Sequence, residues 1–120
     1  MATGVLLCSV CAGCATQGSR PTEEMARAQT LIEQADKAGA QRYAAADLQR
    51  AHDQLNNADK ANAERKYDEA RRYAESAAAD ADVAQARAAA GEADRAAHEV
   101  SQSNRTLRQE SERNPEAEHE

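Results

Sequence analysis

The chain has 120 residues, enough for one small domain, and a formal net charge of −6 with a pI of about 5.1. This acidity, without a Lys/Arg cluster, excludes the usual basic surface that binds nucleic acid. Hydrophobic residues make up 41% of the chain but aromatic residues only 2%, because alanine supplies about a quarter of it. Alanine is the strongest helix former. The composition therefore predicts helices around a thin core, in a marginally stable monomer or in one that self-association stabilises.

The N-terminal stretch resembles a bacterial lipoprotein signal. An apolar run ends at Ala12-Gly13-Cys14, where two small residues precede a cysteine. At such sites the cysteine sulfur is diacylated and the chain is cut before it. The run is shorter than the roughly 20 residues that span a bilayer, but it suits a signal peptide. We therefore expect a signal peptide at residues 1–13, lipidation of Cys14 as the first mature residue, and a lipidated polar tether at residues 14–22.

Two features depart from this pattern. Position 11 is Cys rather than the usual Leu, and the first residues carry no Lys or Arg, which predicts that the true start lies upstream. Cys8, Cys11 and Cys14 also match the opening of an iron–sulfur motif, but that motif requires a fourth cysteine and the chain has three. A disordered N-terminal segment without a signal role is the remaining alternative.

Three helices are expected in an alanine-rich domain over residues 23–108. The first covers residues 23–38 and ends at Gly39, because glycine readily takes the left-handed conformation that terminates helices. The second covers residues 44–62, where apolar residues keep the helical period. The following turn contains neither Gly nor Pro, so one uninterrupted helix through it stays open as an alternative.

The third helix, over residues 66–108, contains the pattern on which the domain depends. Steps of three and four predict one buried stripe of mostly small residues, formed by Tyr67, Ala70, Ala74, Ala77, Ala81, Ala84 and Ala88. Gly91 then interrupts the helix, and the apolar phase shifts to a second stripe formed by Ala93, Ala97, Val100 and Leu107. We expect either a bend at Gly91 or a helix that leaves the bundle. Residues 109–120 lack large apolar side chains, which predicts a disordered acidic tail.

These elements predict an all-α fold, an antiparallel helical hairpin or three-helix bundle with a long C-terminal helix. A TPR-like hairpin is a further option, because residues 67–70 (YDEA) match the second helix of a tetratricopeptide repeat, although no second copy follows. His52, His98 and His119 are isolated, without the spacing of metal ligands. No catalytic motif accompanies them. We therefore expect no enzyme activity, no metal and no cofactor.

Four residues are candidates for binding a partner: Tyr67, Tyr73, Val100 and Leu107. Tyrosine is favoured at interfaces, although sealing a gap between alanine-rich helices is its more common role. Val100 and Leu107 belong to the second stripe. If the helix leaves the bundle, this stripe does not pack in the bundle and is available to a partner. The sequence does not indicate what that partner is.

The pattern of the helices resembles a known family. Over residues 25–100 the chain is similar to the alanine-rich bacterial lipoprotein family called domain of unknown function 4398. The resemblance is carried by residues 43–48, Ala51, Leu55, Ala58, residues 66–70 (KYDEA) and residues 77–81.

The resemblance implies a small periplasmic protein on the outer membrane. Ala15, which follows Cys14, is not the Asp that in many enteric bacteria retains lipoproteins in the inner membrane. We expect a structural or adaptor module, anchored by lipid to the periplasmic face of the outer membrane, with an unknown envelope protein or a second copy of itself as partner. The alternative is a soluble alanine-rich helical protein that self-associates or binds a partner helix.

Overall fold

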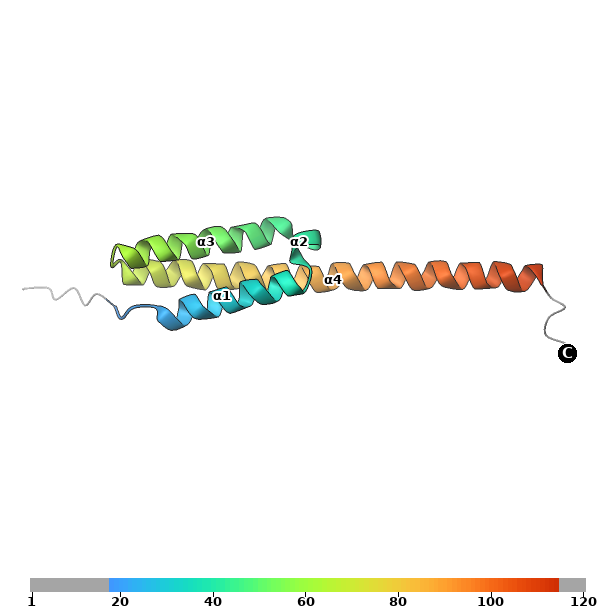
Figure 1. Cartoon of the computed structure of the whole chain (residues 1–120), viewed down its shortest axis with the longest axis horizontal. Helices are drawn as coiled ribbons and strands as arrows, with labels where there is room; N and C mark the ends of the chain where they lie inside the picture. Colours follow the sequence, from blue (N-terminus) through green and yellow to red (C-terminus); the bar gives the residue numbers. More distant parts are fainter. Residues whose placement is uncertain (1–17, 115–120) are drawn as a thin grey trace, which may run out of the picture.

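The computed structural model describes residues 18–114, which form four helices (Figure 1). Helix α1 covers Thr22–Lys37, α2 covers Ala40–Tyr43, α3 covers Ala45–Ala63 and α4 covers Tyr67–Arg113. Helices α1 and α4 run in the same direction, and α3 lies beside them in the opposite direction (Figure 1). Helix α4 continues far beyond the other two. The predicted all-α fold with a long C-terminal helix is confirmed.

The core consists almost wholly of alanine. Among the buried residues of the two described core clusters, only Ile32 and Leu48 are larger than alanine, and Pro21 is buried separately, just before α1. The stripe predicted on α4 is buried against α1 and α3 in six of its members, which we call the inner stripe: Ala70, Ala74, Ala77, Ala81, Ala84 and Ala88. Small side chains let helix axes approach closely. Many short-range dispersion contacts then take the place of the large side chains that fill most cores.

Left-handed residues end α1 and α3. Gly39 has a φ of 88°, and its N–H donates to the carbonyl of Asp36 over 3.0 Å, as the sequence predicts. Arg65 has a φ of 62°, and the N–H of Lys66 donates to the carbonyl of Ala61 over 2.9 Å, which completes a Schellman-type end of α3. The chain thus forms two helices here, and the alternative of one uninterrupted helix is wrong.

The second predicted helix, over residues 44–62, differs from the structure at its start. The short helix α2 precedes it, and Ala44 interrupts the helical path with a φ of −145° before α3 begins at Ala45. The hydrogen bonding changes little, because the N–H of Leu48 still donates to the carbonyl of Ala44 over 3.0 Å. A local break of this kind leaves the hydrophobic period intact, so the sequence pattern does not reveal it.

The C-terminal boundary is also corrected. Residues 109–113, predicted to belong to a disordered acidic tail, are the last residues of α4. Extending an existing helix is much easier than starting one, and the segment contains good helix formers such as Gln, Glu and Arg. Helix α4 ends before Asn114, which precedes Pro115 in the sequence and is therefore disfavoured in the helical conformation. Residues 115–120 of the predicted tail lie outside the described residues.

Gly91 does not bend α4, which continues straight through it (Figure 1). The position instead allows a close approach, because a Cβ atom at Gly91 would lie 2.6 Å from Cγ and 3.0 Å from Cβ of Tyr43. The Tyr43 hydroxyl donates to Oε2 of Glu92 over 3.0 Å, and the guanidinium of Arg42 lies 5.9 Å from the centre of the tyrosine ring. The predicted bend is wrong. The other expectation, that the helix leaves the bundle, is confirmed.

We expect Gly91→Ala to destabilise the fold although alanine favours helices. The propensity gain is about 1 kcal/mol, but the new methyl group meets Tyr43, and overpacking costs about 1–3 kcal/mol. In a Tyr43→Ala background the same change should instead stabilise by about 1 kcal/mol. Urea unfolding of the wild type, both single variants and the double variant measures this reversal. A stabilising Gly91→Ala in the presence of Tyr43 would contradict the close packing.

Candidate functional site

The part of the molecule that leaves the bundle is the C-terminal portion of α4. Ala88 is the last buried residue of this helix, and all residues from 92 to 114 are exposed. We call residues 92–113 the free arm. At a rise of about 1.5 Å per residue it is about 33 Å long. Most helices in proteins depend on packing of one face for their stability, so the exposed surface of the free arm is the first candidate for a binding site.

The free arm shares one apolar face with the outer side of the bundle. The exposed large apolar side chains of the described residues all lie on this face: Val83 (42% exposed), Val100 (60%) and Leu107 (59%). With the residues between them they repeat at alternating steps of four and three, and all are exposed. We call this set the outer stripe: Ala79, Val83, Ala86, Ala90, Ala93, Ala97, Val100, Asn104 and Leu107. Its positions on a helix lie almost opposite the inner stripe.

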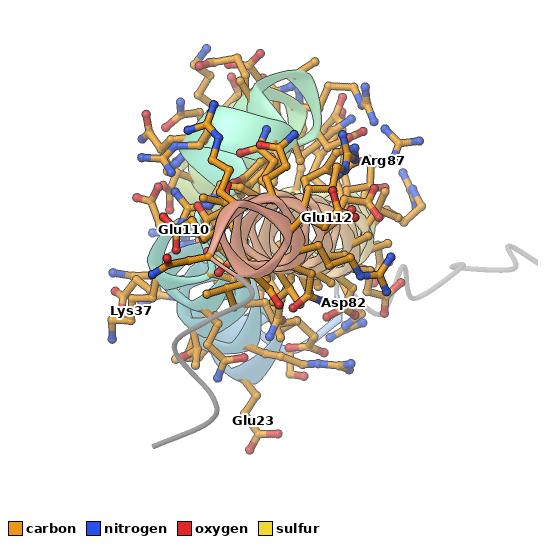
Figure 2. All side chains as sticks on the ribbon, turned by 90° about the vertical axis from the view of Figure 1, so that its right-hand side faces the viewer. Glu23, Lys37, Asp82, Arg87, Glu110 and Glu112 are labelled. Carbon is orange, nitrogen blue, oxygen red and sulfur yellow. The ribbon has the colours of Figure 1, made fainter. Side chains whose placement is uncertain are left out.

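Opposite charges flank the outer stripe. Figure 2 looks along α4 from its C-terminal end and shows Asp82 and Arg87 projecting on the open side of the helix, with α3 and α1 on other sides. On a helix these two positions fall on the two edges of the outer stripe. An apolar seam with charged edges is typical of a surface that packs against another helix.

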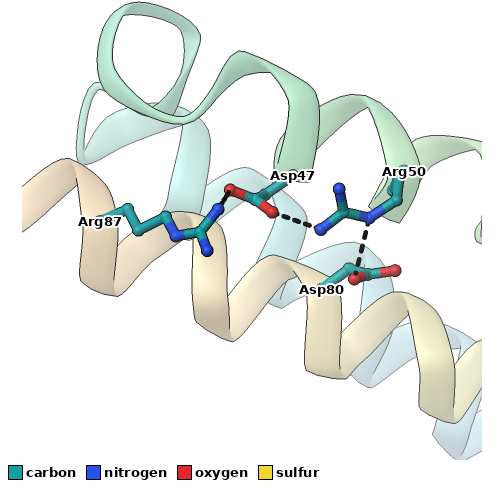
Figure 3. Close-up of polar contacts among 4 residues, drawn as sticks. All are labelled: Asp47, Arg50, Asp80 and Arg87. Atoms are coloured by element: carbon teal, nitrogen blue, oxygen red, sulfur yellow. Dashed lines mark hydrogen bonds and ion pairs between the residues drawn. The ribbon is translucent and has the colours of Figure 1, made fainter.

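A buried carboxylate joins α3 to α4 (Figure 3). Asp47, in the first turn of α3, is only 2% exposed and accepts hydrogen bonds from Arg50 and Arg87. Nε of Arg50 also lies 3.4 Å from Oδ1 of Asp80 on α4. Both arginine side chains are more than half exposed, at 56% and 63%. The arrangement is therefore a bridge between two helices at the rim of the core.

The charge of Asp47 is maintained by its arginine partners. Burial is the largest influence on this group and by itself raises the pKa. Hydrogen bonds from Arg87 and Arg50, with the attraction of their charges, together outweigh burial, so the pKa of Asp47 lies below its ordinary value. In the folded chain Asp47 is therefore ionised at neutral pH and holds α3 against α4.

The structure separates the residues that were predicted to bind a partner. Tyr67 and Tyr73 are half-buried near the start of α4, on the bundle. Val100 and Leu107 lie on the free arm, about 40 Å or more farther along the helix. These four residues therefore do not form one site. Cys14, the predicted lipidation site, lies outside the described residues.

Sequence reasoning misses two features, the half of the outer stripe that lies on the bundle and the buried carboxylate of Asp47. It predicts a second stripe only beyond Gly91, whereas the exposed stripe begins at Ala79 and includes Asn104. The signal that reveals it is the spacing of four and three, which continues unchanged on both sides of Gly91. Asp47 has no such signal, because in the sequence it resembles the many carboxylates on solvated helix faces.

Two other kinds of site are absent from residues 18–114. None of the helices there combines the length and the apolar character that crossing a bilayer requires. In the same residues, His, Cys, Asp and Glu side chains do not gather in groups of three or more that could hold a metal ion.

Comparison with known proteins gives one match. A family model described as "Domain of unknown function (DUF4398)" matches residues 23–100, about two thirds of the chain. The match covers α1, α2, α3 and the part of α4 that ends at Val100. Neither the curated proteins nor the solved structures contain a match to this chain.

Proposed function

The chain belongs to the DUF4398 family, and we propose that it is a lipid-anchored helical module of the bacterial cell envelope. In this proposal Cys14 holds it on the periplasmic face of the outer membrane. The role is structural or that of an adaptor, without catalysis and without a cofactor. A partner protein binds the part of α4 that projects from the bundle.

The observation that carries this proposal is the direction of α4 relative to the start of the described chain. Nη2 of Arg71 donates to the carbonyl of Ser19 over 3.0 Å, and Nε donates to Oε1 of Glu24 over 2.8 Å. These bonds hold the segment before α1, and the first turn of α1, beside the first turns of α4. The free arm extends from the opposite end of the bundle (Figure 1). An anchor at Cys14 would therefore direct α4 away from the membrane.

The dimensions suit such a role. Helix α4 has 47 residues, which corresponds to a rod about 70 Å long. Acyl chains contribute about 0.8 kcal/mol for each buried methylene group, and two chains are sufficient for stable anchoring. A processed and acylated Cys14 would thus retain the module on the membrane without a transmembrane helix, while the free arm remains accessible in the periplasm.

We expect Cys14→Ser to release the protein from the outer membrane. Expressed in its own host from the native upstream region, the wild type should have an intact mass that begins at Cys14 and includes acyl groups. Cys8→Ser is the matched control, because residue 8 leaves with the signal peptide and the mature mass should not change. Membrane fractionation and intact mass spectrometry check both results.

Two outcomes would overturn the lipid anchor. The first is a full-length wild-type mass without acyl groups, which would favour the soluble, self-associating alternative. The second is a Cys14→Ser variant that still fractionates with the outer membrane. The Cys8→Ser control separates a requirement for this one thiol from a general sensitivity of the leader.

A further inference from the structure

We propose that a second copy of this chain covers the outer stripe, so that two α4 helices form a parallel, two-stranded coiled coil. This inference goes beyond the proposed function, because it concerns what the projecting helix binds. It rests on residues 79–107 and does not require the anchor at Cys14.

The spacing of the outer stripe is that of a coiled coil. Val83, Ala90, Ala97 and Asn104 occupy a positions, and the d positions are occupied by Ala79, Ala86, Ala93, Val100 and Leu107. A strict seven-residue repeat makes two helices wind around each other with a left-handed supercoil. The repeat extends over 29 residues, or about 43 Å. It includes most of the free arm, whose residues are all exposed in the described chain.

The chain already packs helices in this way. The inner stripe contacts α3 and α1 through alanines at the same alternating spacing. The outer stripe has the same spacing and adds three larger side chains, Val83, Val100 and Leu107, which are now 42–60% exposed. Burial of these side chains removes the largest exposed apolar groups of the described residues from water.

Charges on the edges of the stripe match in a parallel pair. Asp82 occupies a g position and Arg87 the e position five residues later, so Asp82 of each copy meets Arg87 of the other. Figure 2 shows these two side chains on the open side of α4. Nη1 of Arg87 donates to Asp47, and the Arg87 side chain is 63% exposed. Its other nitrogens can therefore donate to a second carboxylate. The remaining g–e pairs within residues 79–108 each contain at most one charged residue, so none of them places like charges together.

Asn104 fixes the direction of the pair. In a parallel pair it lies opposite Asn104 of the second copy, and the two amides can hydrogen-bond across the seam. In an antiparallel pair centred on the stripe it would face the apolar side chain of Val83, which leaves a polar amide unpaired at a cost. A parallel pair also places the N-termini of both chains at the same end, so the lipid anchors of both copies could insert into the same membrane.

Sedimentation equilibrium of the full chain under reducing conditions tests the association. We expect twice the 12.9 kDa of one chain. The double change Val100→Glu and Leu107→Glu should reduce this mass to that of one chain, because it places charges in the seam without touching the core. Gln102→Glu is the matched control on the opposite face of the free arm and should keep the double mass. A wild-type mass of one chain at every concentration, or of three or more chains, would overturn the proposal.

Cysteine crosslinking tests the direction. In a chain whose three native cysteines are replaced by serine, Ala86→Cys and Ala97→Cys are made separately and oxidised. A parallel pair predicts a covalent dimer from both variants, whereas an antiparallel pair can bring only one of these positions opposite itself. Gln102→Cys should give no dimer.

Crosslinking of one position alone, or of the control as strongly as the others, would overturn the parallel seam. This background cannot be lipidated. Its result is therefore independent of whether the anchor at Cys14 exists.

Discussion

Leu48→Ala should lower the free energy of unfolding by about 2–5 kcal/mol, the usual cost of removing a buried leucine side chain. Leu48 is 4% exposed and lies in one cluster with Ile32, Ala84 and Ala88. The alanines around it have no long side chains that could move into the cavity, so we expect a loss in the upper part of this range. Domains are commonly stable by only about 5–15 kcal/mol. The variant should therefore lose a large share of its stability.

The matched control for this change is Leu107→Ala. Leu107 is 59% exposed, so its truncation should change the stability of a single chain by no more than about 0.5 kcal/mol. Urea unfolding followed by circular dichroism, at a concentration at which single chains predominate, measures both variants. Equal losses for the two variants would contradict a core that depends on two large side chains.

The features that could be predicted from the sequence depend on local geometry. The inner stripe follows from the period of the α-helix, which needs no knowledge of the partner helices. Gly39 ends α1 because glycine is the residue best suited to its φ of 88°. The all-α fold follows from the same period and from the high alanine content. For these features local preference and the global fold agree.

The features that could not be predicted depend on residues far apart in the chain. A glycine within a helix can indicate a bend or a close approach, and at Gly91 the deciding residue is Tyr43, 48 positions earlier. Arg65 takes a left-handed conformation that propensity does not favour for arginine, since the packing of α3 on α4 requires a turn there.

The candidate site divides in the same way. The spacing of the outer stripe and the motif at Cys14 are visible in the sequence. That α4 lies uncovered on one side, from Ala79 onward, depends on where α1 and α3 pack. Sequence reasoning therefore recovers Val100 and Leu107 as candidates but not the bundle half of the stripe, nor the separation of these residues from Tyr67 and Tyr73.

Asp47→Asn should weaken the fold at neutral pH and make it less sensitive to acid. The pKa of Asp47 is lower in the folded chain than the ordinary value of about 3.9. Its contribution to stability is therefore fully present above that value and is lost as the pH falls through the lower, folded pKa. Glu24, through its backbone hydrogen bond and then Arg71, and Glu64, through Lys66, also have lowered pKa values. The wild type should lose stability below about pH 4.

The variant and its control separate the bridge at Asp47 from these exposed pairs. Urea midpoints between about pH 7 and pH 2 should fall less steeply for Asp47→Asn than for the wild type, since one of the linked carboxylates is gone. Asp59→Asn, on the exposed face of the same helix, should keep the wild-type slope. If Asp47→Asn also kept the full slope, the acid response would arise from the exposed pairs of Glu24 and Glu64. Asp47 would then not be the carboxylate that links the stability of the fold to pH.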